Sequence, residues 1–366
     1  MRLKKGPPDF ILFVTTLALL GIGLVMVFSS SAVTTSVNFN DAYYYLKKQL
    51  IWAVLGLIGM FVVMRINYSR LKDLANPLLV IGLVCLVLVI TPLGTEVKGS
   101  SRFLGVAPFV FTPSELMKLA MVVFMAKSLS LNLDKIRDFK TGLAPYLGLL
   151  ALVSLLILKQ PDLGTTVAIA GTFILMITMA GANMAHLGVI AAAGLAAIGA
   201  AIVVAPYRME RWYAFWDPWK YASDEGFQTI QSLYALGSGG LFGMGLGRSR
   251  QKFFYLPEQY TDFVYAILGE ELGFIGAFVV LVLFLLFCWR GFRIALNAPD
   301  IFGSLLAAGI TVMVVLQAAI NIGVVSGLLP VTGITLPFIS YGGTSLLFTL
   351  AGVGLLLNVS RYSNIQ

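Results

Sequence analysis

The chain has 366 residues, of which 58% are hydrophobic and 11% charged, and its mean hydropathy is +0.90. Soluble domains are about 45–50% apolar, so this composition indicates an integral membrane protein and excludes an ordinary soluble enzyme. The net charge of +8 does not indicate a nucleic-acid partner, because the lysines and arginines lie mostly in short segments between apolar runs.

Ten apolar segments follow one another along the chain, and a membrane-spanning helix needs about 20 such residues. The first run, 10–28, is longer than the apolar part of a signal peptide, about 7–15 residues, so we expect an uncleaved first span. The pattern predicts an all-α polytopic membrane protein of about ten transmembrane helices, in one domain over 1–366. The segments are 10–28, 49–64, 77–91, 114–131, 144–158, 165–181, 185–205, 263–289, 303–325 and 340–358.

The positive charges of the short connecting segments predict the orientation, because cytoplasmic loops carry an excess of lysine and arginine. With the N-terminus inside, the short outer loops hold only five cations, Lys47, Lys48, Lys98, Arg102 and Lys159. We therefore expect a multi-pass protein of the cytoplasmic membrane with both termini in the cytoplasm. The larger, cytoplasmic set is Arg2, Lys4, Lys5, Arg65, Arg70, Lys72, Lys127, Lys135, Arg137, Lys140, Arg290, Arg293 and Arg361.

Two polar motifs lie at the ends of the middle spans. In FTPSELMKLA, Glu115 and Lys118 are three residues apart and would meet on one helix face, either as a structural pair or in contact with a substrate in an outward cavity. In QPDLGTT, Asp162 is placed to cap the helix that begins near Gly164.

The segment 206–262, between spans seven and eight, is a long outer loop rich in tryptophan, tyrosine and glycine. Loops of this length are usually functional or disordered, and the aromatic content favours an amphipathic layer on the outer leaflet. Its cations include Arg208 and Lys252, and Arg102 belongs to a shorter outer loop. Such cations suit a pyrophosphate headgroup, or ordinary anionic lipid.

The stretch FFYLPEQYTDFVYAILGEELG places four carboxylates in a chain with few charges. If a helix begins near Pro257, then Glu258, Asp262 and Glu270 lie on one face, and Asp262 lies at the outer membrane surface. Asp262 is then either a general base with a raised pKa or an acid that stabilises the helix dipole. Glu271 is assigned mainly to structure.

The stretch GLLPVTGITLPFISYGGTS contains Pro330, Pro337 and several glycines, which break helices. Irregular backbone at membrane depth is tolerated only where it is buried in protein or lines a cavity. We therefore expect a re-entrant segment beside a site, with Ser340, Thr344 and Ser345 as neutral hydrogen-bond donors.

Histidine and cysteine are too scarce for several kinds of site. His186 is the only histidine, and Cys85 and Cys288 lie inside apolar segments. A histidine-based zinc site, a Ser–His–Asp triad and a disulfide framework are therefore not indicated. No metal-ligand spacing is present, so the sequence names no metal and leaves a divalent cation open.

These motifs together resemble the SEDS family (shape, elongation, division and sporulation), whose members include FtsW, RodA and SpoVE. The resemblance runs from the first span to NVSRYS near the C-terminus and is closest to the FtsW/SpoVE branch. It is carried by FTPSELMKLA, QPDLGTT, APYRMER, GFQTIQSLYALGSGGLFGMGLGRSRQKFFYLPEQYTDFVYAILGEELGFIG and LLPVTGITLPFISYGGTS.

The resemblance implies a peptidoglycan glycosyltransferase that polymerises lipid II at the outer face of the membrane, for cell division, elongation or sporulation. It also implies a class B penicillin-binding protein as transpeptidase partner, beside other divisome or elongasome membrane proteins. The family's essential aspartate falls on Asp262, and the arginine after its Asn-Gly turn falls on Arg102. Here that turn reads Lys-Gly, Phe103 replaces the usual tryptophan, and Thr344 replaces a common serine.

We therefore expect Asp262 to be the catalytic residue. The expected substrate contacts are Arg102, Glu115, Lys118, Arg208, Lys252, Glu258 and Ser345. The main alternative is a lipid II flippase, which would need polar residues along the whole bundle, whereas the charges here gather at the outer ends. A scaffold that recruits division proteins is a third reading.

Overall fold

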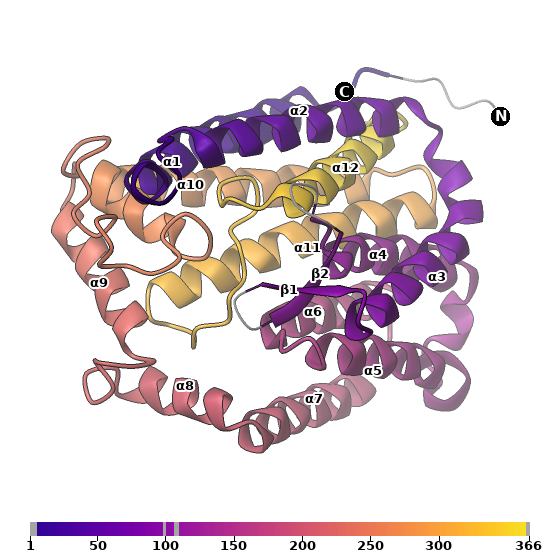
Figure 1. Ribbon diagram of the computed structural model, residues 1–366. Helices are drawn as coiled ribbons and strands as arrows, with labels where there is room; N and C mark the ends of the chain where they lie inside the picture. Colours follow the sequence, from indigo (N-terminus) through magenta and orange to yellow (C-terminus); the bar gives the residue numbers. More distant parts are fainter. Residues whose placement is uncertain (1–5, 98–99, 106–109, 364–366) are drawn as a thin grey trace.

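A computed structural model describes residues 6–97, 100–105 and 110–363 of the chain. Figure 1 shows a bundle of helices, with a small two-stranded hairpin in the middle of this view. Four of the charges used for the orientation, Arg2, Lys4, Lys5 and Lys98, lie outside the described residues.

Each of the ten predicted apolar segments coincides with a helix, and the fold class is confirmed as all-α. Short 3-10 helices lie at Tyr68–Arg70 and Leu133–Lys135, and a π-helical turn lies at Phe139–Leu143. The α-helices of the described residues are α1 (Phe10–Phe39), α2 (Tyr44–Arg65), α3 (Leu71–Ile90), α4 (Pro113–Leu131), α5 (Ala144–Leu158), α6 (Leu163–Met179), α7 (Met184–Val204), α8 (Pro206–Trp216), α9 (Phe227–Gly239), α10 (Val264–Leu296), α11 (Ile301–Val325) and α12 (Gly343–Ser360).

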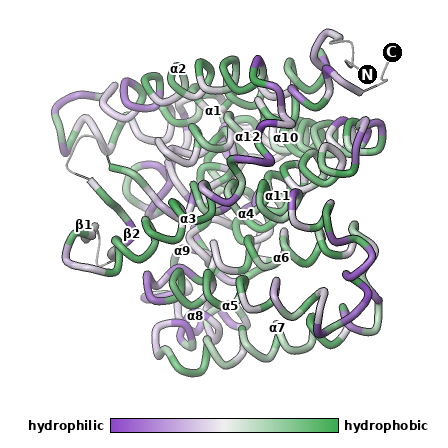
Figure 2. Tube along the Cα trace, turned by 90° about the vertical axis from the view of Figure 1, so that its right-hand side faces the viewer, coloured by the Kyte–Doolittle hydropathy of each residue, from purple (hydrophilic) through white to green (hydrophobic). Residues whose placement is uncertain are grey.

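Eight helical segments of the described chain are long and apolar enough to cross a membrane. Two further predicted spans differ from them: α6 is shorter, and α4 carries Glu115, Lys118 and Lys127. Figure 2 shows hydrophobic residues along most helices and hydrophilic residues concentrated in the connecting segments. The chain is therefore a polytopic membrane protein, and the number of spans stays a prediction of ten.

The helices α11 and α12 form the centre of the bundle. In their most apolar stretches 78% and 72% of the residues are buried, whereas in α7 only 11% are buried. The helix α11 packs against α10, α4 and α6, and α12 packs against α2. In Figure 1, α7 and α8 lie along the lower edge of the molecule. Function that needs a rigid frame is therefore expected near α11 and α12 rather than near α7.

The loop after α3 forms a β-hairpin. Strand β1 (Gly94–Val97) pairs antiparallel with β2 (Ser100–Leu104), with Gly94 opposite Leu104. Backbone bonds between Leu104 and Phe111 continue the pairing toward α4. Arg102 lies on β2 at an irregularity of the register, between Ser101, which pairs with Glu96, and Phe103, which pairs with Thr95.

The expected helix start near Pro257 is wrong, because α10 begins at Val264 and residues 251–263 form successive turns. Glu258 has a φ of +54°, in the left-handed region that helices do not use. The amides of Thr261 and Phe263 both donate to the Glu258 carbonyl, which closes a turn there instead of a helical ladder. The expected single helical face of carboxylates therefore does not form.

The long segment 206–262 contains α8, α9 and a glycine-rich loop that docks on α10. The helix α10 is interrupted at Gly273, which has a φ of +69°. At this break the amides of Met244 and Gly245 donate to the carbonyls of Glu270 and Glu271, at 2.9 and 3.0 Å. Backbone groups that the interruption frees are thus satisfied by the loop.

Candidate active site

A cavity of about 580 Å³ lies between α2, α4, α6, α11 and residues 326–342, the irregular segment that joins α11 to α12. Six of the eight residues expected from the sequence line it, contributed by segments far apart along the chain. They are Arg102, Glu115, Lys118, Glu258, Asp262 and Ser345.

Asp262 lines the cavity from the last turn before α10. Its Oδ2 lies 3.6 Å from the position that a Cβ on Gly333 would take, so the irregular segment passes directly beside the carboxylate. Glu258 lines the same cavity, and its Oε2 accepts a hydrogen bond of 2.9 Å from the Thr261 hydroxyl. The turn therefore presents two carboxylates to one space.

Arg102 lines the cavity and holds the turn between α5 and α6. Its guanidinium donates to the carbonyls of Gln160, at 3.1 Å, and Pro161. It also lies 3.7 Å from the Oδ2 of Asp162. Asp162 caps α6 by accepting the Thr165 amide at 2.9 Å, as the sequence predicts.

Glu115 and Lys118 form the expected ion pair, with 2.9 Å between Oε2 and Nζ. The Lys118 ammonium also donates to Gln317 Oε1 at 2.6 Å, and the Gln317 amide donates to the Thr335 carbonyl at 2.9 Å. Lys118 is only 7% exposed. The pair thus connects α4 through α11 to the irregular segment.

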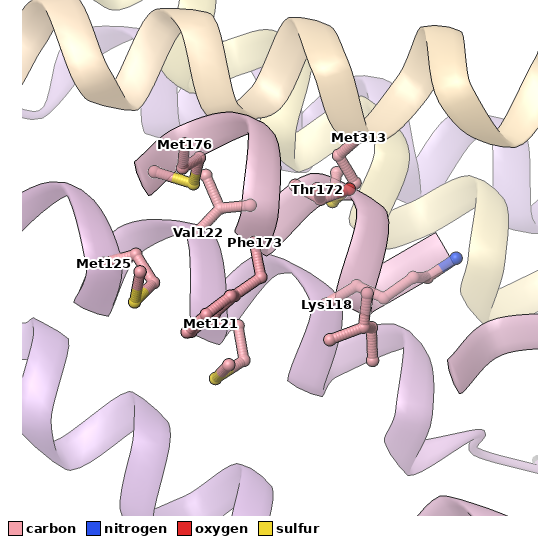
Figure 3. Close-up of a pocket in the computed structure, with 9 residues that line it drawn as sticks. Lys118, Met121, Val122, Met125, Thr172, Phe173, Met176 and Met313 are labelled. Carbon is pink, nitrogen blue, oxygen red and sulfur yellow. The ribbon is translucent and has the colours of Figure 1, made fainter. Parts of the chain in front are cut away.

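The polar lining of the cavity changes at Lys118. A narrow pocket beyond it, about 10 Å³, is lined otherwise by Thr172 and apolar side chains. Figure 3 shows the Lys118 ammonium pointing away from the methionine and phenylalanine side chains of that pocket. These are Met121, Met125, Phe173, Met176 and Met313, with Val122 and Ile169. Lys118 therefore stands between a wide polar space and a nearly filled apolar one.

Aromatic side chains form another wall, which the sequence did not identify. The Tyr45 ring lies 4.6 Å from that of Tyr260 and 4.7 Å from that of Tyr341, between centroids, and Trp52 also lines the cavity. Burial raises the pKa of Tyr260, with a contribution from its hydrogen bond with the Tyr45 hydroxyl, so Tyr260 stays a neutral phenol. Aromatic residues near a membrane surface are also common as lipid anchors, so their types alone do not indicate a site.

Two expected substrate contacts lie elsewhere. Arg208 borders a smaller neighbouring pocket, where it donates to the Tyr207 hydroxyl at 2.8 Å and to the Ala201 carbonyl at 3.0 Å. The neighbouring Arg211 lines the main cavity instead, with its Nε 3.0 Å from Glu225 Oε2. The two arginines lie one helical turn apart on the same side of α8, so the motif YRMER could not show which of them reaches the main cavity.

Lys252 is also separated from the cavity. It is 3% exposed, and its Nζ lies 2.9 Å from the Oε1 of Glu271. Glu271 also accepts from the Ser29 hydroxyl, and Glu270 accepts from the Arg250 amide at 2.9 Å. Lys252 therefore pairs with Glu271 and does not line the cavity, in contrast to the expected substrate contact, and the contacts of Glu271 are those of the structural role expected for it.

The residues present offer limited support for a metal ion. Within the described parts of the chain, no group of three or more histidine, cysteine, aspartate or glutamate side chains is placed to hold one. Mg²⁺ is often held by one or two carboxylates together with substrate phosphates. Glu258 and Asp262 could hold a divalent cation only in that manner.

Comparisons with known proteins match the chain to one family over nearly its whole length. The model of a family described as "Cell cycle protein", FtsW/RodA/SpoVE, matches residues 10–365. Stage V sporulation protein E of Bacillus subtilis (strain 168) is 51% identical over 364 residues, 99% of this chain and 100% of that protein. The "Probable peptidoglycan glycosyltransferase FtsW" of Geobacter metallireducens is 44% identical over 353 residues, covering 96% and 94%.

The chain is also similar to solved structures of peptidoglycan-synthesis and rod-shape proteins. A chain from a peptidoglycan synthase complex, described as coordinating polymerization and crosslinking, matches with a TM-score of 0.79 and 33% identity, over 97% of this chain and 98% of that chain. The rod shape determining protein RodA of Thermus thermophilus matches with a TM-score of 0.73 and 29% identity, over 98% of each chain.

Proposed function

The chain belongs to the FtsW/RodA/SpoVE family, and we propose that it is a peptidoglycan glycosyltransferase that polymerises lipid II into glycan strands at the outer face of the bacterial cytoplasmic membrane. One observation carries the proposal. The Asp262 carboxylate borders a cavity of about 580 Å³ that is also lined by Arg102, Lys118 and Arg211. A base and several cations in one space are the groups that this reaction needs.

Polymerisation joins a sugar hydroxyl to an anomeric carbon that carries a lipid pyrophosphate. In our proposal Asp262 accepts the hydroxyl proton as the oxygen forms its bond to the anomeric carbon. The bond from that carbon to the pyrophosphate oxygen breaks, and its electron pair leaves with the pyrophosphate. The product is a longer glycan and a free lipid pyrophosphate.

The cations serve the departing pyrophosphate, where negative charge develops. Arg102 and Lys118 both line the cavity and are held by hydrogen bonds, so they need little reorganisation as the charge forms. Arg211 lines both the main cavity and the neighbouring pockets. A divalent cation held with the pyrophosphate oxygens would add positive charge at the same place.

We place the cavity at the outer surface and both termini in the cytoplasm. The contacts near the termini support this orientation: the Gly6 amide donates to the Arg361 carbonyl, and Asp9 pairs with Arg290 near the end of α10. Asp262 precedes the other end of α10. The match of the family model over 10–365 supports a single membrane domain over 1–366.

We propose a class B penicillin-binding protein as partner, because polymerised strands need crosslinking and the solved complex coordinates both steps. Other divisome or elongasome membrane proteins would recruit the pair to its place of work.

A lipid II flippase would carry a polar headgroup across the whole bundle. The wide polar space ends at Lys118, and the pocket beyond it has room for about one water molecule. A headgroup would have to open this apolar packing, so the geometry favours the polymerase.

The test is reconstitution of the purified full chain with its transpeptidase partner and labelled lipid II. We expect glycan strands that lengthen with time. Movement of labelled headgroups across a liposome membrane without glycan formation would support the flippase instead. Neither activity, in a protein that still recruits its partners, would support the scaffold.

A further inference from the structure

The turn that carries Asp262 is held through its backbone carbonyls by three consecutive hydrogen bonds. The Tyr260 carbonyl accepts from the Tyr341 amide at 2.9 Å. The Thr261 carbonyl accepts from the Ser340 hydroxyl at 2.5 Å, and the Asp262 carbonyl accepts from the Asn321 side-chain amide at 2.7 Å. All three donors come from α11 or from the irregular segment after it.

Asn321 joins this turn to the irregular segment. Its amide nitrogen donates to the carbonyls of both Asp262 and Ile334, each at 2.7 Å, and the residue is 1% exposed. Ser340 acts in a similar way, because its hydroxyl donates to Thr261 and accepts the Leu336 amide at 2.8 Å. The two side chains therefore fix one wall of the cavity against another.

The turn that carries Asp262 is not held by the backbone hydrogen bonds of a helix. Residues 257–263 precede the first turn of α10, and Glu258 has a φ of +54°. A carboxylate on such a turn depends on outside partners for its position, and the α11 backbone that bears Asn321 is among the most buried in the described chain.

We infer that Asn321 and Ser340 are positioning residues that fix the backbone of Asp262, so that its carboxylate meets the attacking hydroxyl. The inference rests on the proposed role of Asp262 as the base. It assigns to two buried neutral side chains an effect on the chemical step. Displacement of a reacting group by about 1 Å can cost on the order of 100-fold in rate.

The chain offers a matched control in Asn358. This asparagine of α12 is also 1% exposed, and its side-chain amide donates to the carbonyls of Val63, Met64 and Ile66. It ties the end of α2 to the end of α12 and does not line the cavity. Its loss removes similar bonds without touching the turn of Asp262.

The experiment uses the full chain with its transpeptidase partner and measures kcat, KM for lipid II and the thermal midpoint Tm. We expect Asn321→Ala and Ser340→Ala to lower kcat on the order of 10-fold to 100-fold, with KM unchanged. Asn358→Ala should lower Tm at least as much as Asn321→Ala while keeping the parent kcat. Ser340→Thr, which keeps the hydroxyl, should restore much of the kcat that Ser340→Ala loses.

The outcomes separate two failures. An inactive parent protein would contradict the proposed function itself. An active parent with a parental kcat in Asn321→Ala and Ser340→Ala would overturn only the positioning role. If Asn321→Ala does not fold, Ser340→Ala decides, and equal loss of kcat in Ser340→Ala and Asn358→Ala would reduce the effect to general stability.

Discussion

The Nζ of Lys252 lies 2.9 Å from the Oε1 of Glu271, in an ion pair whose two side chains are 4% and 0% exposed. The pair fastens the glycine-rich loop to α10 just before its interruption at Gly273. Glu271 also accepts from Ser29 of α1, so the pair joins three parts of the chain. The pair therefore stabilises the packing of α1, α10 and the loop, and neither side chain lines the cavity.

The Lys252–Glu271 pair gives a first prediction. Lys252→Met leaves a buried carboxylate without its cation, and we expect the free energy of unfolding to fall by about 3–5 kcal/mol. The double variant Lys252→Met/Glu271→Gln should regain most of that stability and polymerise lipid II at the parental rate. Thermal unfolding and polymerisation measure the two properties. A double variant that is stable but inactive would contradict this structural role and would indicate that Lys252 contacts the substrate.

The Glu115–Lys118 pair should behave in the opposite way. Lys118→Met is expected to destabilise the protein by about 3 kcal/mol, because the remaining carboxylate is largely buried. In Glu115→Gln/Lys118→Met the stability should recover but the polymerisation should not, since the cavity has lost a cation. Parental activity in the stable double variant would exclude Lys118 from binding the substrate.

Gly333 tests the space beside Asp262. It has a φ of +74°, and an added Cβ would lie 3.6 Å from the Asp262 Oδ2. We expect Gly333→Ala to cost about 1 kcal/mol of stability because of its positive φ, and to lower kcat because the added methyl group, in van der Waals contact with the carboxylate, occupies space beside it. Gly181→Ala is the control, because Gly181 has a φ of +86° and nothing within 4 Å of its Cβ position. Equal kcat in the two variants would argue against a constraint at the carboxylate.

The tyrosine wall predicts a loss of stability at alkaline pH. Burial, the largest cause, raises the pKa of Tyr260 and Tyr341 above the ordinary value of 10.0. Their contribution is complete below about pH 10 and is lost as pH rises further, because only the unfolded phenols ionise readily there. We expect Tm to fall above about pH 10 and Tyr341→Phe to reduce that fall. An identical pH dependence in Tyr341→Phe would contradict this role.

Local patterns in the sequence predicted the parts of the site that depend on near neighbours. The helix cap of Asp162 and the pair of Glu115 with Lys118 each involve residues three positions apart, so spacing was sufficient. The apolar runs likewise predicted the positions of ten helices.

Tertiary contacts decided the rest. Lys252 and Ser29 are 223 residues apart in the sequence, and Asn321 and Asp262 are 59 residues apart. No local sequence pattern could therefore predict either contact. The predicted helix start at Pro257 failed for a related reason: the turn that replaces it is held by donors from α11 and the segment after it. Helical spacing left the role of Asp262 open, and the family resemblance selected it from the four carboxylates.

Polymerisation of lipid II by Asp262→Asn tests the central claim most directly. The variant keeps the size of the side chain and removes the base, so we expect lipid II to bind while the rate of strand formation falls on the order of 100-fold or more. Asp224→Asn, at an exposed acid outside the main cavity, should keep the parental rate. Parental polymerisation by Asp262→Asn would contradict the account.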